Sequence, residues 1–153
     1  MNRSSQLVSG HLEKHLYLLD GSNIACFYGK KNADHTLIIT AVTSILEHDK
    51  KAEIFVVVDA TLRHQVRDKQ GFEEMLSRSF IHQAPAGTTA DYFIKNIAES
   101  FGSGIKVIIV SNDLYRKLGM EGFFRVKFMF YNIAERTGVI FYPDFAELNQ
   151  AWD

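Results

Sequence analysis

Four aspartates stand where structural elements are expected to begin or end, and they are the residues best suited to do chemistry. They are Asp20, Asp59, Asp91 and Asp113. Carboxylates that share one crevice repel one another and lose hydration, and a cation can offset that cost. Mg²⁺ and Mn²⁺ prefer oxygen ligands and retain several waters, so aspartates together with a phosphate suit either ion. The pattern therefore predicts metal-assisted cleavage of a phosphodiester bond, in which the ion activates water and neutralises charge on the phosphate.

Each of these aspartates also has a purely structural interpretation. Asp20 precedes a glycine and could form an Asx turn, and for Asp59 a turn and a ligand role are equally supported. Asp91 could serve only as a partner of the helix dipole, while Asp113 could cap the helix that follows it. The repetition of the same residue type at four element ends favours a common site.

The segments between these acids alternate between strand and helix patterns. Strands are predicted at 17–19, 54–58, 80–81, 105–110, 124–131 and 138–142, with residues 135–138 as the turn before the last one. Helices are predicted from residue 34 or 36 to 48, at 72–76, from about 90 to 101, and at 114–118. A threonine is expected to cap the third of these helices. Residues 60–70 are expected to form a loop or a short helical turn. Strands separated by helices imply a mainly parallel sheet with right-handed crossovers on both faces. We therefore expect a three-layer α/β/α sandwich whose acids meet at the carboxyl edge of the sheet.

Length and composition are those of an ordinary globular protein. With 153 residues and 46% hydrophobic content, we expect one domain over 1–153 with its core at about 15–145. No apolar stretch is long enough to span a membrane and no signal-peptide core follows Met1, so a cytoplasmic protein without a membrane partner is expected. The single cysteine, Cys26, excludes an internal disulfide and a Cys-rich zinc site, and its apolar neighbours indicate a small core residue.

Net charge gives no general sign of nucleic-acid binding. The formal charge is −1 at pH 7, so any contact with a polyanion must come from a local patch. Basic residues follow several of the acidic element ends and could contact phosphates without reading sequence. They are Lys30, Lys31, Arg63, His64, Arg67, Arg116 and Lys117.

Three motifs in the same order resemble the NYN branch of PIN-like ribonucleases. They are Asp20-Gly21-Ser22-Asn23-Ile24-Ala25, Thr89-Ala90-Asp91-Tyr92-Phe93-Ile94 and Val110-Ser111-Asn112-Asp113-Leu114-Tyr115-Arg116. The likeness is greatest to the Regnase-type domain found in CCCH zinc-finger proteins and in bacterial relatives. It implies a Mg²⁺- or Mn²⁺-dependent endoribonuclease that acts on single-stranded or loop RNA, with Asp20, Asp91 and Asp113 as catalytic and metal-binding acids.

The resemblance also implies roles for polar residues around these acids. Asn23 and Asn112 would orient the acids or the scissile phosphate, and Ser22, which belongs to the first motif, would contact substrate. Arg63 and Arg116 fall where the family places basic residues, and both are expected to bind substrate phosphates.

Two positions depart from the family pattern. Regnase-type domains commonly carry paired acids where this chain has Ala90-Asp91, and often another acid where it has Lys117. Metal affinity could therefore be lower, or Asp59 could replace the missing ligand. A catalytically weakened RNA-binding or partner-binding module is the first alternative, and a structure-specific DNA nuclease is the second. The strands between residues 124 and 142 could leave an edge for pairing, so a homodimer is also considered.

Overall fold

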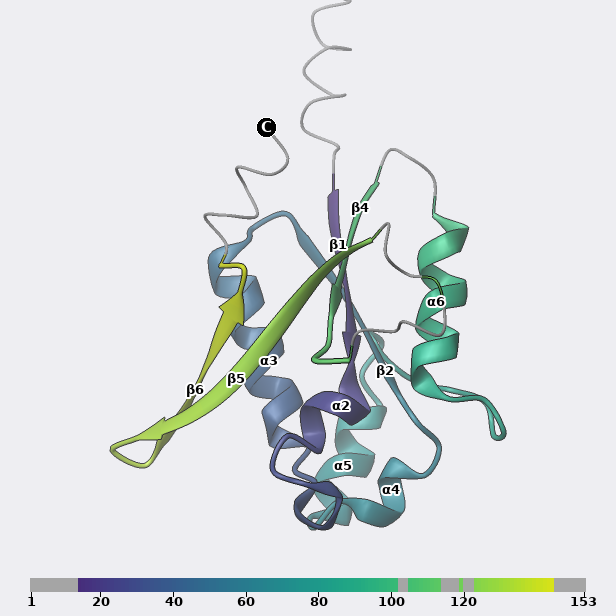
Figure 1. Ribbon diagram of the computed structural model, residues 1–153. Coiled ribbons are helices and arrows are strands. Elements are labelled where there is room, and N and C mark those ends of the chain that lie inside the picture. The colour runs from purple at the N-terminus through teal and green to yellow at the C-terminus, as the bar shows by residue number, and fades with distance from the viewer. Residues whose placement is uncertain (1–13, 102–104, 114–118, 120–122, 145–153) are drawn as a thin grey trace, which may run out of the picture.

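Six strands form one sheet in the computed structural model, which describes residues 14–101, 105–113, 119 and 123–144 (Figure 1). The strands are β1 (Lys14–Asp20), β2 (Ala52–Val58), β3 (Ile81–Gln83), β4 (Ile105–Val110), β5 (Phe124–Ile133) and β6 (Arg136–Tyr142). Their order in the sheet is β3-β2-β1-β4-β5-β6. The first five strands are parallel and β6 pairs antiparallel with β5. The carboxyl ends of β1, β2 and β4 therefore share one edge.

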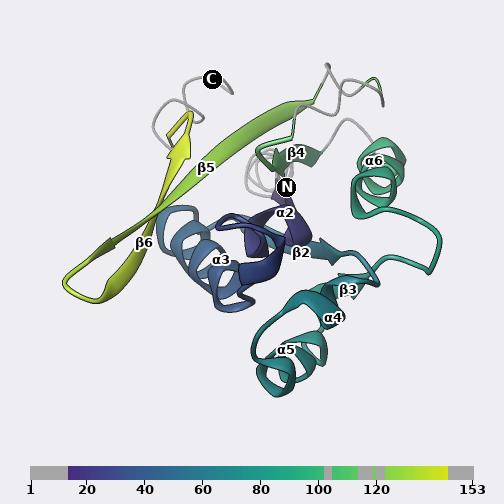
Figure 2. The same cartoon turned by 60° about the horizontal axis from the view of Figure 1, so that its bottom comes forward.

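Helices cover both faces of this sheet. They are α2 (Gly21–Ala25), α3 (Thr36–His48), α4 (Leu62–Gln65), α5 (Lys69–Leu76) and α6 (Ala90–Ser100), with a 3₁₀ turn at Lys30–Asn32. Side chains alternate along β1: Tyr17 and Leu19 join the core beneath α3, while Leu18 packs with Ile94 of α6 on the other face. Figure 2 shows α6 on one side of the sheet and α3 on the other. The predicted α/β/α sandwich with a mainly parallel sheet is confirmed.

The predicted elements differ from the observed ones mainly at turns. The turn before β6 was expected at residues 135–138, but it consists of Ala134 and Glu135, which have φ values of 52° and 65°. Both residues adopt the left-handed backbone that a tight hairpin requires, without the Asn-Gly sequence that usually marks it. Gly138 therefore lies within β6. The sequence patterns also gave no sign of α2, and the helix predicted at 114–118 lies outside the described residues.

None of the described helices is long and apolar enough to cross a membrane.

Candidate active site

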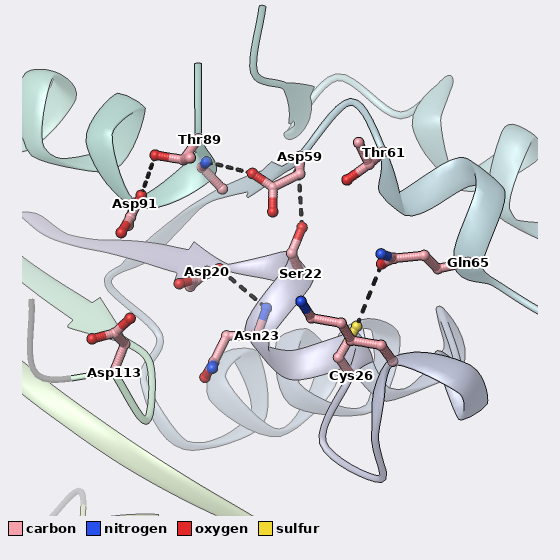
Figure 3. Close-up of a pocket in the computed structure, with 12 residues that line it drawn as sticks. Asp20, Ser22, Asn23, Cys26, Asp59, Thr61, Gln65, Thr89, Asp91 and Asp113 are labelled. Atoms are coloured by element: carbon pink, nitrogen blue, oxygen red, sulfur yellow. Dashed lines mark hydrogen bonds between the residues drawn. The ribbon is translucent and has the colours of Figure 1, made fainter. Parts of the chain in front are cut away.

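A pocket of about 360 Å³ lies at the carboxyl edge of the parallel strands (Figure 3). All four predicted aspartates line it, and each comes from a different element end. The other lining residues are Ser22, Asn23, Cys26, Lys30, Thr61, Gln65, Thr89 and Ala90. In Figure 3, Asp20, Asp91 and Asp113 lie toward one end of the pocket, and Cys26 and Gln65 lie toward the other. The topology thus brings together acids that are far apart in the sequence.

Asp20 is buried at the end of β1, and both of its carboxylate oxygens accept hydrogen bonds. One carboxylate oxygen accepts a hydrogen bond from the backbone N–H of Asn23 at 3.1 Å, which caps α2. The other oxygen accepts a bond from the Ser111 hydroxyl at 3.3 Å. Gly21 is required next to it, because a Cβ there would lie 2.6 Å from a methyl carbon of Val58. Directly after Asp20, α2 therefore passes close to β2.

Asp59 joins β2 to two other elements. Its carboxylate accepts a hydrogen bond from the backbone N–H of Ala90 at 2.6 Å. Its own N–H donates to the Ser22 hydroxyl oxygen at 2.7 Å. As expected, a threonine, Thr89, is the N-cap residue of α6, but its side chain makes no capping bond. Asp59, directly after β2, supplies an acceptor for the first N–H of the helix.

Asp91 and Asp113 are held by local hydrogen bonds. Asp91 lies in the first turn of α6, where it accepts bonds from the Thr89 hydroxyl and from the backbone N–H of Tyr92, the latter at 2.8 Å. The backbone N–H of Asp113 donates to the Ser111 hydroxyl oxygen at 3.0 Å. Ser111 is fully buried. Its hydroxyl connects the backbone of Asp113 with the carboxylate of Asp20.

The two asparagines expected to face substrate have different surroundings. Asn23 lines the pocket, and its side-chain oxygen accepts a bond from the backbone N–H of Asn112 at 2.8 Å. The amide of Asn112 instead pairs with the backbone of Phe128 in β5, donating to its carbonyl at 3.1 Å and accepting from its N–H at 2.9 Å. Asn112 therefore fastens β5 to the loop after β4, and contact with substrate remains a prediction.

The basic residues divide between the pocket and its surroundings. Lys30 is the only cation among the described lining residues. Arg63 lies on α4, does not line the pocket, and has a guanidinium nitrogen 3.7 Å from the Glu73 carboxylate. Arg116 and Lys117 lie outside the described residues, so the structure tests neither of them.

Cys26 differs from the buried core residue that was expected. It is half-buried, packs against the core beneath α3 and also lines the pocket, with its thiol 3.8 Å from the Gln65 side-chain oxygen. Burial raises the pKa of this thiol, the nearby Lys30 lowers it in part, and Asp59 and Asp20 raise it further. The thiol is therefore protonated at neutral pH and unsuited to nucleophilic attack.

The sequence gave weaker signals for the remaining lining residues. Ser111 stands inside the third motif, so its place beside Asp20 could have been anticipated from that motif. Thr61 and Gln65 had only their position after Asp59 to indicate them. Gln65, the last residue of α4, contacts the Cys26 thiol, and Thr61 precedes the same helix.

The donor set of the pocket is suited to a hard divalent cation. Its side chains offer mainly carboxylate, amide and hydroxyl oxygens, which are the ligands of Mg²⁺ and Mn²⁺. Within the described residues, no three His, Cys, Asp or Glu side chains are arranged so that they could hold a metal ion by themselves. The oxygen donors of the pocket are thus spread around its wall and do not form a compact three-ligand site. Such donors fit an ion that keeps part of its water shell and needs few protein ligands.

The fold and pocket define an α/β protein with an acidic site at the carboxyl edge of a parallel sheet. A family model described as the Zc3h12a-like Ribonuclease NYN domain matches residues 13–144. The chain belongs to this family, which supports a ribonuclease role and RNA as the substrate. The predicted likeness to NYN ribonucleases is confirmed. The comparison with curated proteins finds no match.

Proposed function

We propose that the protein is a divalent-metal-dependent endoribonuclease that cleaves single-stranded or loop RNA in the acidic pocket. The observation that carries the proposal is that Asp20, Asp59, Asp91 and Asp113 line one pocket although they come from four separate elements. Against these carboxylates the described lining offers one ammonium group, that of Lys30. An RNA phosphate entering this pocket would be repelled unless a cation accompanied it.

Because no three of these carboxylates are placed to bind one ion by themselves, Asp20, Asp91 and Asp113 would hold a hydrated cation partly through its bound waters, with Asp59 as an additional ligand. When bound, Mg²⁺ or Mn²⁺ would supply activation of the attacking water and neutralisation of the phosphate charge. Asn23 would position the phosphate through its side-chain NH₂ group, because its side-chain oxygen is already bonded to the Asn112 backbone. The Ser22 hydroxyl, whose oxygen accepts the Asp59 N–H, keeps a proton with which it could bond substrate.

The position of Asp59 bears on the departure from the family pattern at Ala90. Its carboxylate bonds to the Ala90 backbone, so it lies beside the position where related domains commonly carry a second acid. This contact supports the hypothesis that Asp59 replaces the missing ligand.

Cleavage of labelled RNA tests the proposal directly. A single-stranded RNA and a DNA of the same sequence are incubated with the protein in Mn²⁺, in Mg²⁺ and in EDTA. We expect RNA to be cut internally with either metal and to remain intact in EDTA. Cleavage of DNA alone would instead establish the structure-specific DNA nuclease.

Asp20→Asn is the decisive variant because Asn keeps the capping acceptor of α2 while removing the charge. We expect its cleavage rate to fall by about 100-fold or more, since metal-site acids supply several kcal/mol of transition-state stabilisation. Glu74→Gln is the matched control, because Glu74 is an exposed acid on α5, away from the pocket lining. RNA binding without turnover under any of these metal conditions would establish the non-catalytic module instead.

A further inference from the structure

The β5–β6 hairpin carries an exposed face that the proposed chemistry does not use. Figures 1 and 2 show the hairpin projecting from the rest of the sheet. On its inner side Phe128, Phe130 and Phe141 are buried in the core beneath α3. The residues that alternate with them point to the other side. They are Arg125, Lys127, Met129, Tyr131 and Ile133 on β5, and Arg136, Gly138, Ile140 and Tyr142 on β6; we call this set the hairpin outer face.

The hairpin outer face is positively charged. Neither strand contains an aspartate or a glutamate, although acids slightly outnumber Lys and Arg in the whole chain. Lys127 and Arg136 are exposed, and neither forms a salt bridge with a carboxylate of the described residues. The two strands carry three cations and no carboxylate, and the exposed Glu135 of the turn beside Arg136 offsets one of these charges. The remaining excess of positive charge is complementary to a phosphate backbone.

The same face presents aromatic rings. Tyr131 and Tyr142 are 40% and 49% exposed, so their side chains are available for contact. Gly138 stands opposite Tyr131, and a Cβ there would collide with the Tyr131 ring. The ring therefore lies across the neighbouring strand, and Tyr131 also lines a hollow with residues of α3, whereas Tyr142 does not. Aromatic rings interleaved with cations form the surfaces on which single-stranded nucleic acids stack their bases.

The hairpin outer face begins beside the acidic pocket. Arg125 donates to the carbonyl oxygen of Ser111 at 3.5 Å, and Ser111 bonds to the Asp20 carboxylate. Lys127 and Met129 flank Phe128, whose backbone is paired with the side chain of Asn112. From Lys127 to Ile133 the strand extends for about 20 Å at the usual rise per residue. The hairpin outer face therefore starts next to the residues that surround Asp20.

We propose that the hairpin outer face is a binding platform for single-stranded RNA, contacting phosphates through Lys127 and Arg136 and stacking bases on Tyr131 and Tyr142. The proposal rests on the proposed ribonuclease function for the identity of the ligand. The exposed Met129 and Ile140 would also suit a protein interface. The cations and the absence of acids on both strands favour RNA.

RNA affinity is measured in the Asp20→Asn background, so that binding is separated from turnover. Fluorescence anisotropy with a labelled oligouridylate is followed at several salt concentrations. We expect Lys127→Glu combined with Arg136→Glu to weaken binding at least about tenfold and to lower the slope of log affinity against log salt by about 1.4, which corresponds to two lost phosphate contacts. Lys50→Glu with Arg78→Glu is the matched control, since both cations are exposed and lie outside the hairpin.

Stacking is tested separately at Tyr142. We expect Tyr142→Ala to weaken binding by about tenfold, and Tyr142→Phe, which keeps the ring, to bind like the parent protein. Equal affinity and equal salt slope for the charge-reversed variant and its control would overturn the platform. Metal-dependent cleavage by the otherwise unmodified protein is scored independently, so the pocket and the platform can fail separately.

Sedimentation velocity decides between RNA and a second copy of the chain. We expect a monomer that Met129→Asp leaves unchanged. A dimer that Met129→Asp dissociates without altering RNA affinity would overturn the proposal and assign the face to self-association.

Discussion

The carboxylate of Asp59 and the backbone N–H of Ala90 form a 2.6 Å hydrogen bond between residues 31 positions apart. The bond joins the end of β2 to the beginning of α6. One residue thus caps a helix and also lines the acidic pocket. The two roles can be separated, because capping requires an acceptor and metal binding favours a charge.

Asp59→Asn keeps an acceptor for Ala90 and removes the charge. We expect its melting temperature to stay close to that of the parent protein, while the Mn²⁺ concentration needed for half-maximal RNA cleavage rises. Asp59→Ala should in addition lose about 1 kcal/mol of stability, the usual cost of a deleted cap. Asp34→Asn is the control, since Asp34 accepts from the Thr36 N–H outside the pocket. An unchanged Mn²⁺ requirement in Asp59→Asn would exclude Asp59 as a ligand.

Ala90→Asp restores the paired acids of related domains. Ala90 is only 2% exposed and lies against Asp59, so a new carboxylate there should destabilise the metal-free protein through charge repulsion. Mn²⁺ should then raise the melting temperature of the variant by more than it raises that of the parent. Asn96→Asp adds the same charge to an exposed position on α6 and should show no such gain. Equal Mn²⁺-induced shifts in both variants would contradict a cation site beside Ala90.

Modification of Cys26 should block the pocket. Cys26 is the only cysteine of the chain and lines the pocket near Gln65. We expect N-ethylmaleimide to react slowly at pH 7, because burial raises the pKa of the thiol, and to abolish RNA cleavage once it has reacted. Cys26→Ala should be active and insensitive to the reagent. Full activity of the modified parent protein, with its circular dichroism unchanged, would show that RNA is not cleaved in the pocket that Cys26 lines.

A hydrogen-bonded cluster at the opposite end of the sheet should control stability in acid. The Asp49 carboxylate contacts the Tyr17 hydroxyl at 2.6 Å and the His15 ring nitrogen at 2.7 Å. Burial alone would raise the pKa of Asp49, but the bonds from Tyr17, His15 and the Lys51 N–H outweigh it, and the pKa is lowered. Because the folded pKa lies below the unfolded value, the stabilisation is present above about pH 4 and is lost as pH falls through the folded pKa.

Tyr17→Phe tests this cluster by removing one donor. Burial and the bond to Asp49 raise the pKa of Tyr17, so the hydroxyl keeps its proton and donates at every working pH. We expect the variant to lose about 1.5–3 kcal/mol near neutral pH, the usual contribution of a hydrogen bond to a charged group. Urea unfolding followed between pH 3 and pH 7 should show this loss shrink as Asp49 becomes protonated. A loss that is constant over the whole range would attribute the effect to packing alone.

The sequence predicted the sheet better than it predicted the contacts around the pocket. Apolar runs of strand length ended in aspartates, and the rule that parallel strands share a carboxyl edge brought Asp20, Asp59 and Asp113 together. The helix α2 escaped prediction because five residues are too few to show a hydrophobic period, although the Asn23 N–H donates a capping bond to the Asp20 carboxylate.

Contacts between distant elements could not be read from local patterns. The pairing of the Asn112 amide with the Phe128 backbone is one example, because that partner is known only once β5 is placed beside β4. The helix cap supplied by Asp59 is of the same kind, since local capping rules consider only neighbours in the sequence. Arg63 likewise appeared close to the pocket because it follows β2, yet α4 carries it toward Glu73.

The side-chain amide of Asn112 pairs with the backbone of Phe128 as the peptide group of a neighbouring strand would. This pairing determines which part of the hairpin can be altered. Because Asn112 fixes the alignment of β5 at Phe128, the exposed turn residues Ala134 and Glu135 can be changed without shifting the acids, whereas Phe130 and Phe141 are held in the core. A fluorophore or affinity tag inserted between Ala134 and Glu135 would therefore lie at the tip of the β5–β6 hairpin. It would report on ligands that bind the hairpin and leave the acidic pocket unchanged.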